Sequence, residues 1–449
     1  MGKEPPRGRF WRPRGGAVTT SGSFADASTS NRSADELGRG VSAALGRRRL
    51  VILIAVFLYL FGLVMVTSAT SGTELLNTGD QWGYFRKQAL FGVMGFTVMF
   101  IAMRFPLTVL RRLAGPIMFF SLMLVLAVFV PGLGSSAKGA TRWIALGSFQ
   151  MQPSEVVKIA VILYLADFLA YARYPVHWLN DFVKSPGGVG LFAAGVVFIQ
   201  KDLGSALVIG SVVLSMYMLA GTSWRLLLRV VGPAIALVVL GILSEEYRRE
   251  RFLAFINPWA DPHGTGYQLV QALIAIGSGG VFGVGLGHSV QKIRFLPEAH
   301  TDMIFSIVSE ELGLIGAAVV LFSFLAIAVV GTRIAMKATS RFYALVAAGL
   351  TAMLCLQAAI NLGGVVGVLP LTGVPLPLVS YGGTNLLVTL ASLGLLANVA
   401  TAGQHDASAH PDSDPDLLED DFDVDNDPNA YRNRRWWNSR APRAGAGSS

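Results

Sequence analysis

The sequence predicts an all-α integral membrane protein, a polytopic bundle of about ten transmembrane helices. Of its 449 residues, 53% are hydrophobic and only 14% are charged, whereas soluble domains carry about a quarter charged residues. Apolar runs of roughly 17–25 residues recur along the chain, and this is the length at which a helix crosses a bilayer. The runs do not alternate apolar and polar residues, which excludes the strands of a membrane β-barrel.

The net charge and the cysteine content further restrict which partners and covalent links this membrane protein can have. The net charge of +8 comes from basic residues scattered between the apolar runs. This distribution suits contact with anionic membrane lipids and argues against a nucleic-acid partner. The single cysteine, Cys355, lies inside an apolar run, so no intrachain disulfide can form.

The N-terminal residues 1–46 are rich in Gly, Ser, Pro and Arg, and they are predicted to form a disordered cytoplasmic tail. No apolar core occurs within the first thirty residues, so this tail is not a cleaved signal peptide. Three arginines at 47–49 precede the first predicted span, residues 50–68. A basic cluster at this boundary holds the N-terminus in the cytoplasm.

The next three spans are predicted at residues 85–103, 113–131 and 156–171. Arginines between the second and third spans indicate a cytoplasmic loop. The loop that contains Arg142 and Trp143 therefore lies outside by parity. The fourth helix is expected to begin near Pro153, because proline suits the first helical turn, with Gln152 or Ser154 in the cap region.

Residues 188–220 form an apolar stretch that is too long for one ordinary span. A polar interruption at 200–204 favours two spans, the fifth and sixth, joined by a tight outside turn. One long tilted helix is the alternative, and it would invert every later segment. The two-span order puts Arg225 and Arg333 in cytoplasmic loops, where short basic loops are expected.

The remaining spans complete a ten-span domain over residues 47–402, and they are predicted at 226–243, 303–330, 342–360 and 385–400. A long polar insert, residues 245–302, separates the seventh and eighth spans outside the membrane. Residues 403–449 are predicted to be a second disordered cytoplasmic tail. This tail is either a solvated linker or a docking segment for a cytoplasmic partner or the membrane surface.

The insert ends in ionisable residues just before the eighth span. Glu298, His300 and Asp302 stand at alternate positions and would share one side of an extended segment. Such a cluster at a membrane surface suits chemistry on a lipid-linked substrate. The three groups could orient a base or bind a divalent cation, although their spacing specifies no particular metal.

Four motifs are distributed along the predicted membrane domain: 152–155 (Gln-Pro-Ser-Glu), 257–268 (Asn-Pro-Trp-Ala-Asp-Pro-His-Gly-Thr-Gly-Tyr-Gln), 289–302 (Ser-Val-Gln-Lys, then Leu-Pro-Glu-Ala-His-Thr-Asp) and 373–383 (Gly-Val-Pro-Leu-Pro-Leu-Val-Ser-Tyr-Gly-Gly). Together they resemble the SEDS family (shape, elongation, division and sporulation proteins) over residues 50–400. The third motif is more similar to the division (FtsW) branch than to the elongation (RodA) branch. Lys201, His288 and Met303 depart from the family pattern, which leaves the role of the 200–204 turn open.

The resemblance implies a peptidoglycan glycosyltransferase of the bacterial cytoplasmic membrane. Its substrate would be lipid II, a polyprenyl-pyrophosphate-linked disaccharide peptide, polymerised at the outer face by inverting transfer. The implied partners are a class B penicillin-binding transpeptidase and other proteins of the division septum. No cofactor is implied with certainty, and a divalent cation stays open.

Asp302 matches the catalytic aspartate of the family, so the resemblance implies that it is the general base. A positioned carboxylate can take a hydroxyl proton, and aspartate is ordinarily ionised at neutral pH. The alternative is that Asp302 caps the eighth helix through its backbone N–H groups. Both interpretations stay open, because a helix N-terminus also positions a carboxylate.

Other ionisable residues near these motifs are candidate substrate contacts. Arginine forks bind phosphate bidentately, and the basic residues are the pool for a pyrophosphate site or for contacts with lipid headgroups. Ionisable residues at membrane depth either pair with each other or line a cavity, and this choice is open for the acidic residues at 310–311 as well. The candidate substrate contacts are Arg142, Glu155, Lys158, Arg248, Arg251, Lys292, Glu298 and His300, with Arg294 as a further outside cation.

Two glycine-rich stretches complete the prediction. Residues 277–287 contain six glycines but follow no predicted strand, so they fail the context test for a phosphate-binding loop. They are interpreted as a flexible or re-entrant segment that lets the insert move. Residues 370–383 are uncharged and are expected to dip back into the membrane.

Two rival functions share these features. A flippase for lipid II also needs a lipid-sized cavity and headgroup contacts, but it needs no base. A scaffold that recruits division proteins through its tails is the third interpretation. The outside location predicted for Asp302 favours chemistry.

Overall fold

The computed structural model describes residues 23–78, 80–137, 140–146, 149–171, 179–244, 246–292 and 295–402. The chain divides into two units, Met1–Ala402 and Gly403–Ser449, and only the first contains described residues. The predicted C-terminal tail therefore lies outside the described residues, as do residues 1–22 of the predicted N-terminal tail.

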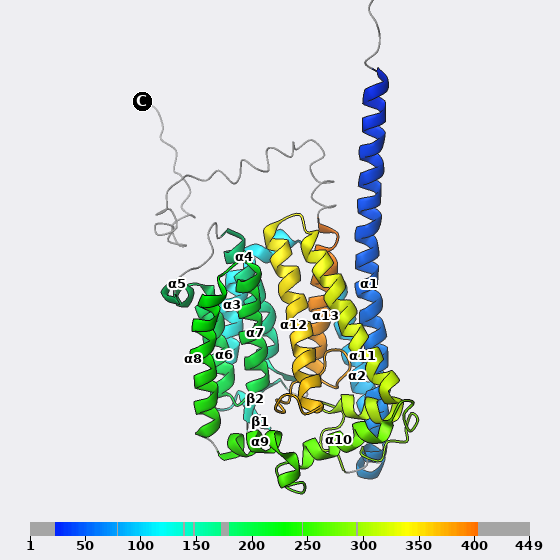
Figure 1. Ribbon diagram of the computed structural model, residues 1–449, viewed down its shortest axis with the longest axis vertical. Coiled ribbons are helices and arrows are strands. Elements are labelled where there is room, and N and C mark those ends of the chain that lie inside the picture. The colour runs from blue at the N-terminus through cyan, green and yellow to red at the C-terminus, as the bar shows by residue number, and fades with distance from the viewer. Residues whose placement is uncertain are drawn as a thin grey trace, which may run out of the picture. The chain divides into compact units, whose positions relative to one another are not determined.

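The described part of the chain is a helical bundle in which ten helices coincide with the ten predicted spans (Figure 1). Six are long and apolar enough to cross a membrane, α6, α7 and α13 are shorter apolar helices, and α4 has 19 residues. The predicted helical membrane fold is confirmed. The ten helices are α1 (Ser23–Thr78), α2 (Gly83–Ala102), α3 (Leu107–Ala127), α4 (Pro153–Tyr171), α6 (Pro186–Ile199), α7 (Leu203–Leu219), α8 (Trp224–Leu243), α11 (Ile304–Met336), α12 (Arg341–Val365) and α13 (Gly383–Val399).

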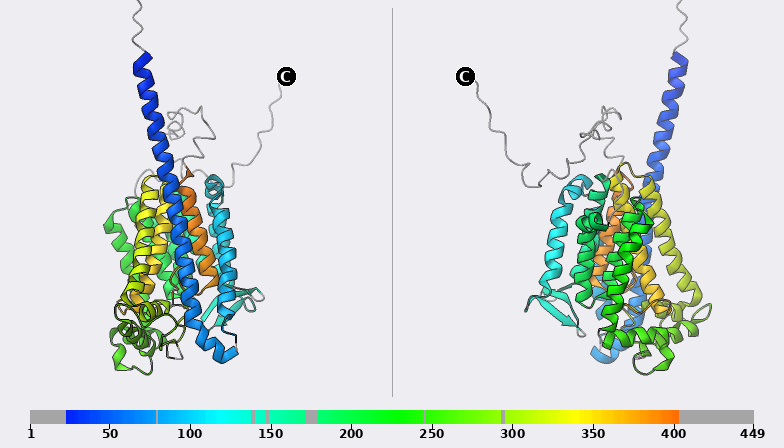
Figure 2. Two further views of the ribbon diagram at one scale, coloured as in Figure 1. Left: turned by 90° about the vertical axis from the view of Figure 1, so that its right-hand side faces the viewer. Right: turned by 60° about the vertical axis from the view of Figure 1, so that its left-hand side comes forward.

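The two ends of this bundle carry different connections (Figures 1 and 2). At one end, which we call the insert end, lie a small sheet and the helices α9 (Glu246–Ile256) and α10 (Tyr267–Gly279). The opposite end carries α5 (Leu179–Lys184) and the short connections from α2 to α3, from α7 to α8 and from α11 to α12. The insert end therefore gathers the long polar segments of the sequence.

The core of the bundle is built from its central helices. α13 is buried along nearly its whole length, and it packs with α2, α4 and α12. By contrast, α8 buries few residues and exposes apolar side chains such as Leu237 and Leu240. An apolar exposed face of this kind is expected for a helix that lies against lipid.

The stretch 188–220 forms two helices, so the alternative of one long tilted helix is wrong. α6 ends at Ile199 and α7 begins at Leu203. Between them Lys201 has a φ of 65°, and the Asp202 carboxylate accepts a hydrogen bond of 3.1 Å from Ser205 N. This cap satisfies a backbone N–H at the start of α7, and it fixes the turn at the insert end.

Helix α1 begins earlier than the sequence predicts. The predicted tail 1–46 is helical from Ser23 onwards, so the disordered interpretation is wrong for residues 23–46. Adding residues to an existing helix costs far less than nucleating one. The membrane span can therefore extend into a preceding segment that forms no core of its own.

A three-stranded antiparallel sheet at the insert end was not predicted. Its strands are β1 (Gly134–Ala137), β2 (Ala140–Leu146) and β3 (Phe149–Met151), in the order β1-β2-β3. β2 contains Thr141, Trp143 and Ile144, which are residue types that favour strands. Hydropathy detects spans rather than short hairpins, so the all-α prediction needs this small correction.

The glycine-rich segment after α10 is held by backbone bonds to α11. Helix α11 is broken at Gly313, whose φ is 65° and ψ −158°. At the break Val284 N donates to Glu310 O at 2.9 Å, Gly285 N donates to Glu311 O at 3.0 Å, and Leu314 N donates to Gly280 O at 2.9 Å. These bonds replace helical ones that the break removes. The segment is therefore paired along α11, which differs from the predicted role of letting the insert move.

We expect Gly283→Ala to destabilise the protein by about 1–3 kcal/mol, the range for overpacking a filled site. A Cβ at Gly283 would lie 2.1 Å from Glu311 O, and its φ is 79°. The matched control is Gly277→Ala within α10, where a Cβ would meet nothing within 4 Å. It should be neutral or stabilising by up to about 1 kcal/mol. Thermal unfolding in detergent measures both, and equal melting temperatures would contradict the close-approach argument.

Candidate functional site

Asp302 lies in a run of turns at the insert end, immediately before α11. The N-cap residue of α11 is Met303, whose side chain makes no capping hydrogen bond. Asp302 therefore lies one residue before the N-cap position. Its carboxylate Oδ1 accepts a hydrogen bond of 3.1 Å from the hydroxyl of Thr301. The side chain is half-buried.

A small pocket lies directly beside this carboxylate. It encloses about 170 Å³, a volume that includes open solvent, and it is lined by Asp302, by Asn361 and neighbouring residues of α12, and by residues 371–374. A Cβ added at Gly373 would lie 3.8 Å from Asp302 Oδ2. The carboxylate thus faces the glycine-containing segment, where a reacting hydroxyl could approach it.

Glu298 and His300 do not share one side of an extended strand, because the segment turns. Glu298 has a φ of 56°, and its carbonyl accepts a hydrogen bond of 3.0 Å from Thr301 N. The Thr301 hydroxyl lies 3.4 Å from Glu298 Oε2, and the same hydroxyl bonds Asp302. The turn therefore brings Glu298 close to Asp302 through their shared contact with Thr301. The predicted extended segment would have placed both residues on one side of a strand instead.

His300 belongs to an aromatic cluster. Its ring centroid lies 4.6 Å from that of Tyr84 and 5.6 Å from that of Tyr381, and Tyr381 N donates to His300 O at 2.8 Å. The cluster ties the Asp302 turn to the segment that leads into α13.

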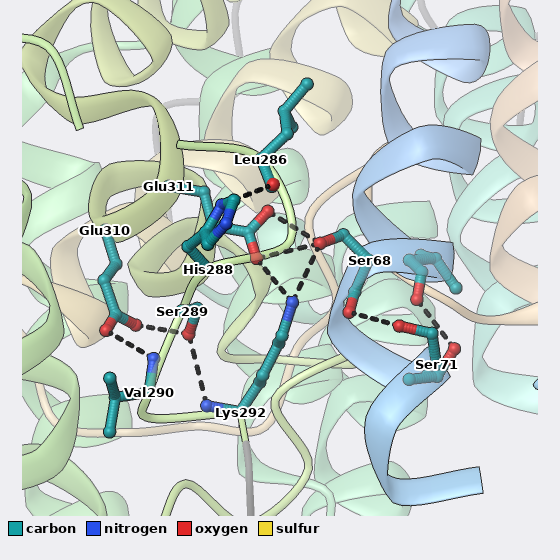
Figure 3. Close-up of polar contacts among 11 residues, drawn as sticks. Ser68, Ser71, Leu286, His288, Ser289, Val290, Lys292, Glu310 and Glu311 are labelled. Atoms are coloured by element: carbon teal, nitrogen blue, oxygen red, sulfur yellow. Dashed lines mark hydrogen bonds and ion pairs between the residues drawn. The ribbon is translucent and has the colours of Figure 1, made fainter. Parts of the chain in front are cut away.

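Lys292 is buried in an ion pair (Figure 3). Its Nζ lies 2.8 Å from Glu311 Oε1 and 3.2 Å from the Ser68 hydroxyl, and this hydroxyl donates to the Glu311 carboxylate. Next to this triad, Glu310 accepts bonds from the Ser289 hydroxyl and from Val290 N. Two adjacent carboxylates of α11 thus hold the 289–292 motif.

The predicted pairing of Glu155 with Lys158 is present and fully buried. Lys158 Nζ lies 2.7 Å from Glu155 Oε1 and 2.7 Å from Gln357 Oε1. Gln357 also donates to Asn385 Oδ1 at 2.8 Å and to Pro375 O at 3.0 Å. Burying these charges requires such partners. The network joins α4, α12 and α13 beneath the 373–383 motif, and the cavity-lining alternative stays a prediction.

The basic residues that were predicted to bind the pyrophosphate lie in different surroundings. Arg142 lies in β2 and is partly buried, and its Nε has no hydrogen-bond partner among the described residues. Arg248 and Arg251 lie in α9, but their side chains fall outside the described part, as does Arg294 entirely. Lys292 is paired with Glu311.

A wider groove borders α9. It encloses about 800 Å³ of space open to solvent and is lined by α9, the 264–269 segment, Pro297 and Leu371. Leu371 also lines the pocket beside Asp302. The groove therefore adjoins both the pocket beside Asp302, through Leu371, and the helix that carries Arg248 and Arg251.

The 257–268 motif is organised by a local turn. The Asp261 carboxylate accepts bonds from Thr265 N at 2.8 Å and Gly264 N at 3.0 Å. The backbone N–H of Thr265, above all, lowers the pKa of this exposed carboxyl, with smaller contributions from Gly264 and the Thr265 hydroxyl. The motif therefore shapes the loop between α9 and α10.

Several buried polar residues that join the motifs were missed by the sequence prediction. Asp202 accepts bonds from Gln152 Nε2 at 2.7 Å and from the Ser154 hydroxyl at 3.2 Å. Asn361 Nδ2 donates to Asp302 O and to Val374 O, each at 2.8 Å. A signal did exist, because polar side chains inside apolar spans usually face the bundle interior.

Among the described residues, no group of three or more His, Cys, Asp and Glu side chains is arranged to hold a metal ion. A divalent cation therefore stays a prediction.

Comparisons with known proteins identify the chain's relatives. The family model described as "Cell cycle protein", covering FtsW, RodA and SpoVE, matches residues 48–405. A probable peptidoglycan glycosyltransferase FtsW of Geobacter metallireducens is 41% identical, over 78% of this chain and 94% of that protein. Its Escherichia coli counterpart is 38% identical, over 75% and 82%.

Solved structures agree with these relatives. A structure described as the structural coordination of polymerization and crosslinking by a peptidoglycan synthase complex matches with a TM-score of 0.66 and 28% identity, over 78% of this chain and 97% of that chain. The rod shape determining protein RodA of Thermus thermophilus matches with a TM-score of 0.57 and 29% identity, over 78% and 95%. The resemblance seen in the four motifs is confirmed, and the chain belongs to the FtsW/RodA/SpoVE family of cell cycle proteins.

Proposed function

We propose that this protein is a peptidoglycan glycosyltransferase that polymerises lipid II, and that it acts in cell division. The observation that carries the proposal is the half-buried Asp302 carboxylate, which lies just before α11 and lines a pocket at the insert end. The names of the relatives support the reaction class. Their FtsW designation favours the division role over the elongation role of RodA-like proteins.

The proposed reaction is a single displacement. The 4-hydroxyl of one lipid-linked disaccharide transfers its proton to Asp302 while its oxygen forms a bond to the anomeric carbon of the other chain. The bond from that carbon to the pyrophosphate oxygen breaks, and the polyprenyl pyrophosphate leaves with the electron pair. Such a reaction needs a positioned base and positive charge for the leaving group.

The geometry supports the following proposed residue roles. Arg142, Arg248 and Arg251 are assigned to the leaving pyrophosphate, because they lie on elements of the insert end and α9 borders the wide groove. Lys292 is reassigned from substrate binding to holding the insert, since Glu311 neutralises it. Glu298 and His300 orient the turn that carries Asp302. The buried pair of Glu155 and Lys158 supports the 373–383 motif through Gln357.

The proposed orientation puts the insert end outside the cytoplasmic membrane and both termini in the cytoplasm. Basic residues of the short connections, such as Arg104, Arg225 and Lys337, lie at the opposite end, which supports a cytoplasmic location for that end. Septal localisation follows from the proposed division role. Lipid II would then be used where the nascent wall is built.

We expect single cysteines at positions 259 and 277 to react with an impermeant reagent in intact cells, after Cys355 is replaced. Cysteines at positions 225 and 337 should react only after permeabilisation. The reason is the charge asymmetry between the two ends. Labelling at 337 but not at 277 in intact cells would overturn the orientation.

A class B penicillin-binding transpeptidase with one membrane span is the proposed partner. Helix α11 exposes large apolar side chains, among them Leu321, Phe322 and Leu325. Such a surface suits lateral packing of a partner helix in the bilayer. The neighbouring solved complex couples polymerization with crosslinking, which supports a polymerase and a crosslinker acting together here.

The test of the proposed function is polymerisation of lipid II by the protein purified in mild detergent, with any transpeptidase that co-purifies. Glycan strands on a gel are the expected result. Translocation of lipid II in vesicles without polymer would favour the flippase. Polymer formed without any co-purifying transpeptidase would support the proposed enzyme activity but contradict the proposed partner.

A further inference from the structure

Asn361 of α12 contains a buried polar atom that the proposed mechanism has not used. The residue is 4% exposed. Its Oδ1 is buried and has no hydrogen-bond partner among the described residues. Buried acceptors are normally satisfied, so this oxygen calls for a donor that comes from elsewhere.

The orientation of the Asn361 amide is determined by its neighbours. Its Nδ2 lies 2.8 Å from Asp302 O and 2.8 Å from Val374 O. A flipped amide would put Oδ1 against two carbonyl oxygens, none of which can donate. Both amide protons are therefore engaged, and Oδ1 is available only to a donor.

The position of Asn361 indicates where this donor enters. Asn361 and Asp302 line the same small pocket, whose enclosed space fits a group the size of a water molecule or a hydroxyl, and apart from Thr372 its other lining side chains are apolar. The Asp302 carboxylate and the covered amide oxygen of Asn361 thus lie at the same pocket, and both are acceptors. A pyrophosphate, which carries negative charge, would be repelled here, whereas a neutral group with several hydroxyls supplies the missing donors.

We propose that Asn361 Oδ1 binds the acceptor sugar, by accepting a hydrogen bond from a hydroxyl next to the one that Asp302 deprotonates. The inference rests on the proposed glycosyl transfer. On N-acetylglucosamine the 3-hydroxyl and the 6-hydroxyl flank the reacting 4-hydroxyl. The Asn361 oxygen and the Asp302 carboxylate are held close together by the hydrogen bond from Asn361 Nδ2 to the Asp302 carbonyl. The two acceptors would bind two neighbouring hydroxyls of the sugar, and this binding would orient the reacting hydroxyl towards the carboxylate.

The experiment measures transfer to acceptor analogues that lack one flanking hydroxyl. The donor is lipid II with its own 4-hydroxyl blocked, so that only the analogue can accept. For the wild type, removal of one of the two hydroxyls should lower kcat/KM for the acceptor by about 10- to 100-fold, because a buried acceptor is then left unpaired. Asn361→Leu should lower kcat/KM for the complete acceptor by a similar factor and show no further loss with that analogue.

The chain offers a matched control in Asn398 of α13. This buried asparagine also donates its Nδ2 to two carbonyls, those of Ala102 at 2.9 Å and Phe105 at 2.7 Å, but it lies at the opposite end of the bundle. Asn398→Leu loses the same two bonds and should keep the wild-type discrimination between acceptors. Asn361→Asp keeps an oxygen acceptor but loses both N–H donors. This variant should also keep the wild-type discrimination between acceptors, even if its transfer rate is lower.

Equal use of both analogues and the complete acceptor by the wild type would overturn the proposal. The proposal would also be overturned if Asn361→Leu and the missing hydroxyl each lowered kcat/KM independently, so that the two factors multiplied. In that case Asn361 would only position Asp302. A wild type that forms no product with the complete acceptor is a different result, since it rejects the proposed function itself.

Discussion

Asp302→Asn is expected to fold normally and to lose polymerisation by about 10²–10⁴-fold, the range for removal of a general base. The carboxamide cannot accept the hydroxyl proton. Its oxygen can still accept the bond from the Thr301 hydroxyl that the carboxylate accepts. Asparagine has nearly the size of aspartate and keeps an oxygen acceptor, so the melting temperature should stay unchanged.

The measurement compares purified wild type and variant on lipid II in detergent, with strands followed by gel. Asp261→Asn is the matched control, because Asp261 is a carboxylate of the same insert whose bonds come from backbone N–H groups, and asparagine can accept those bonds. It should retain most of the activity. Equal polymer from Asp302→Asn and wild type would remove Asp302 from the mechanism.

Glu311→Gln is expected to destabilise the protein by about 3–5 kcal/mol, the cost of leaving one charge of a buried pair without its partner. The Glu311 side chain is 0% exposed and that of Lys292 is 4% exposed. The loss should also reduce polymerisation, because the pair holds the 289–292 motif ten residues before Asp302. Replacing both partners, as Lys292→Met with Glu311→Leu, should recover most of the stability, since paired apolar replacements are often neutral.

Thermal unfolding of the single and double variants checks this coupling. The matched control is Glu246→Gln, which removes an exposed pair with Arg249 at 3.8 Å and should change stability by no more than about 1 kcal/mol. A double variant as unstable as the sum of its two single variants would show that the pair is not coupled.

The sequence by itself determined the spans of this protein. A bilayer selects apolar runs by their length, and this local property located all ten helices. A polar turn within 188–220 was enough to predict two helices rather than one. Asp302 was found because it ends the insert and precedes an apolar run, within a motif that resembles a family.

The surroundings of these residues were decided by the tertiary structure alone. Lys292 was a candidate for the pyrophosphate because it is a basic residue near the motifs of the insert, yet its partners Glu311 and Ser68 lie 19 and 224 residues away. Asn361 reaches Asp302 across 59 residues. Hydropathy depends on local composition, whereas such pairs depend on how each helix is rotated and packed against its neighbours, and only the folded bundle sets that rotation.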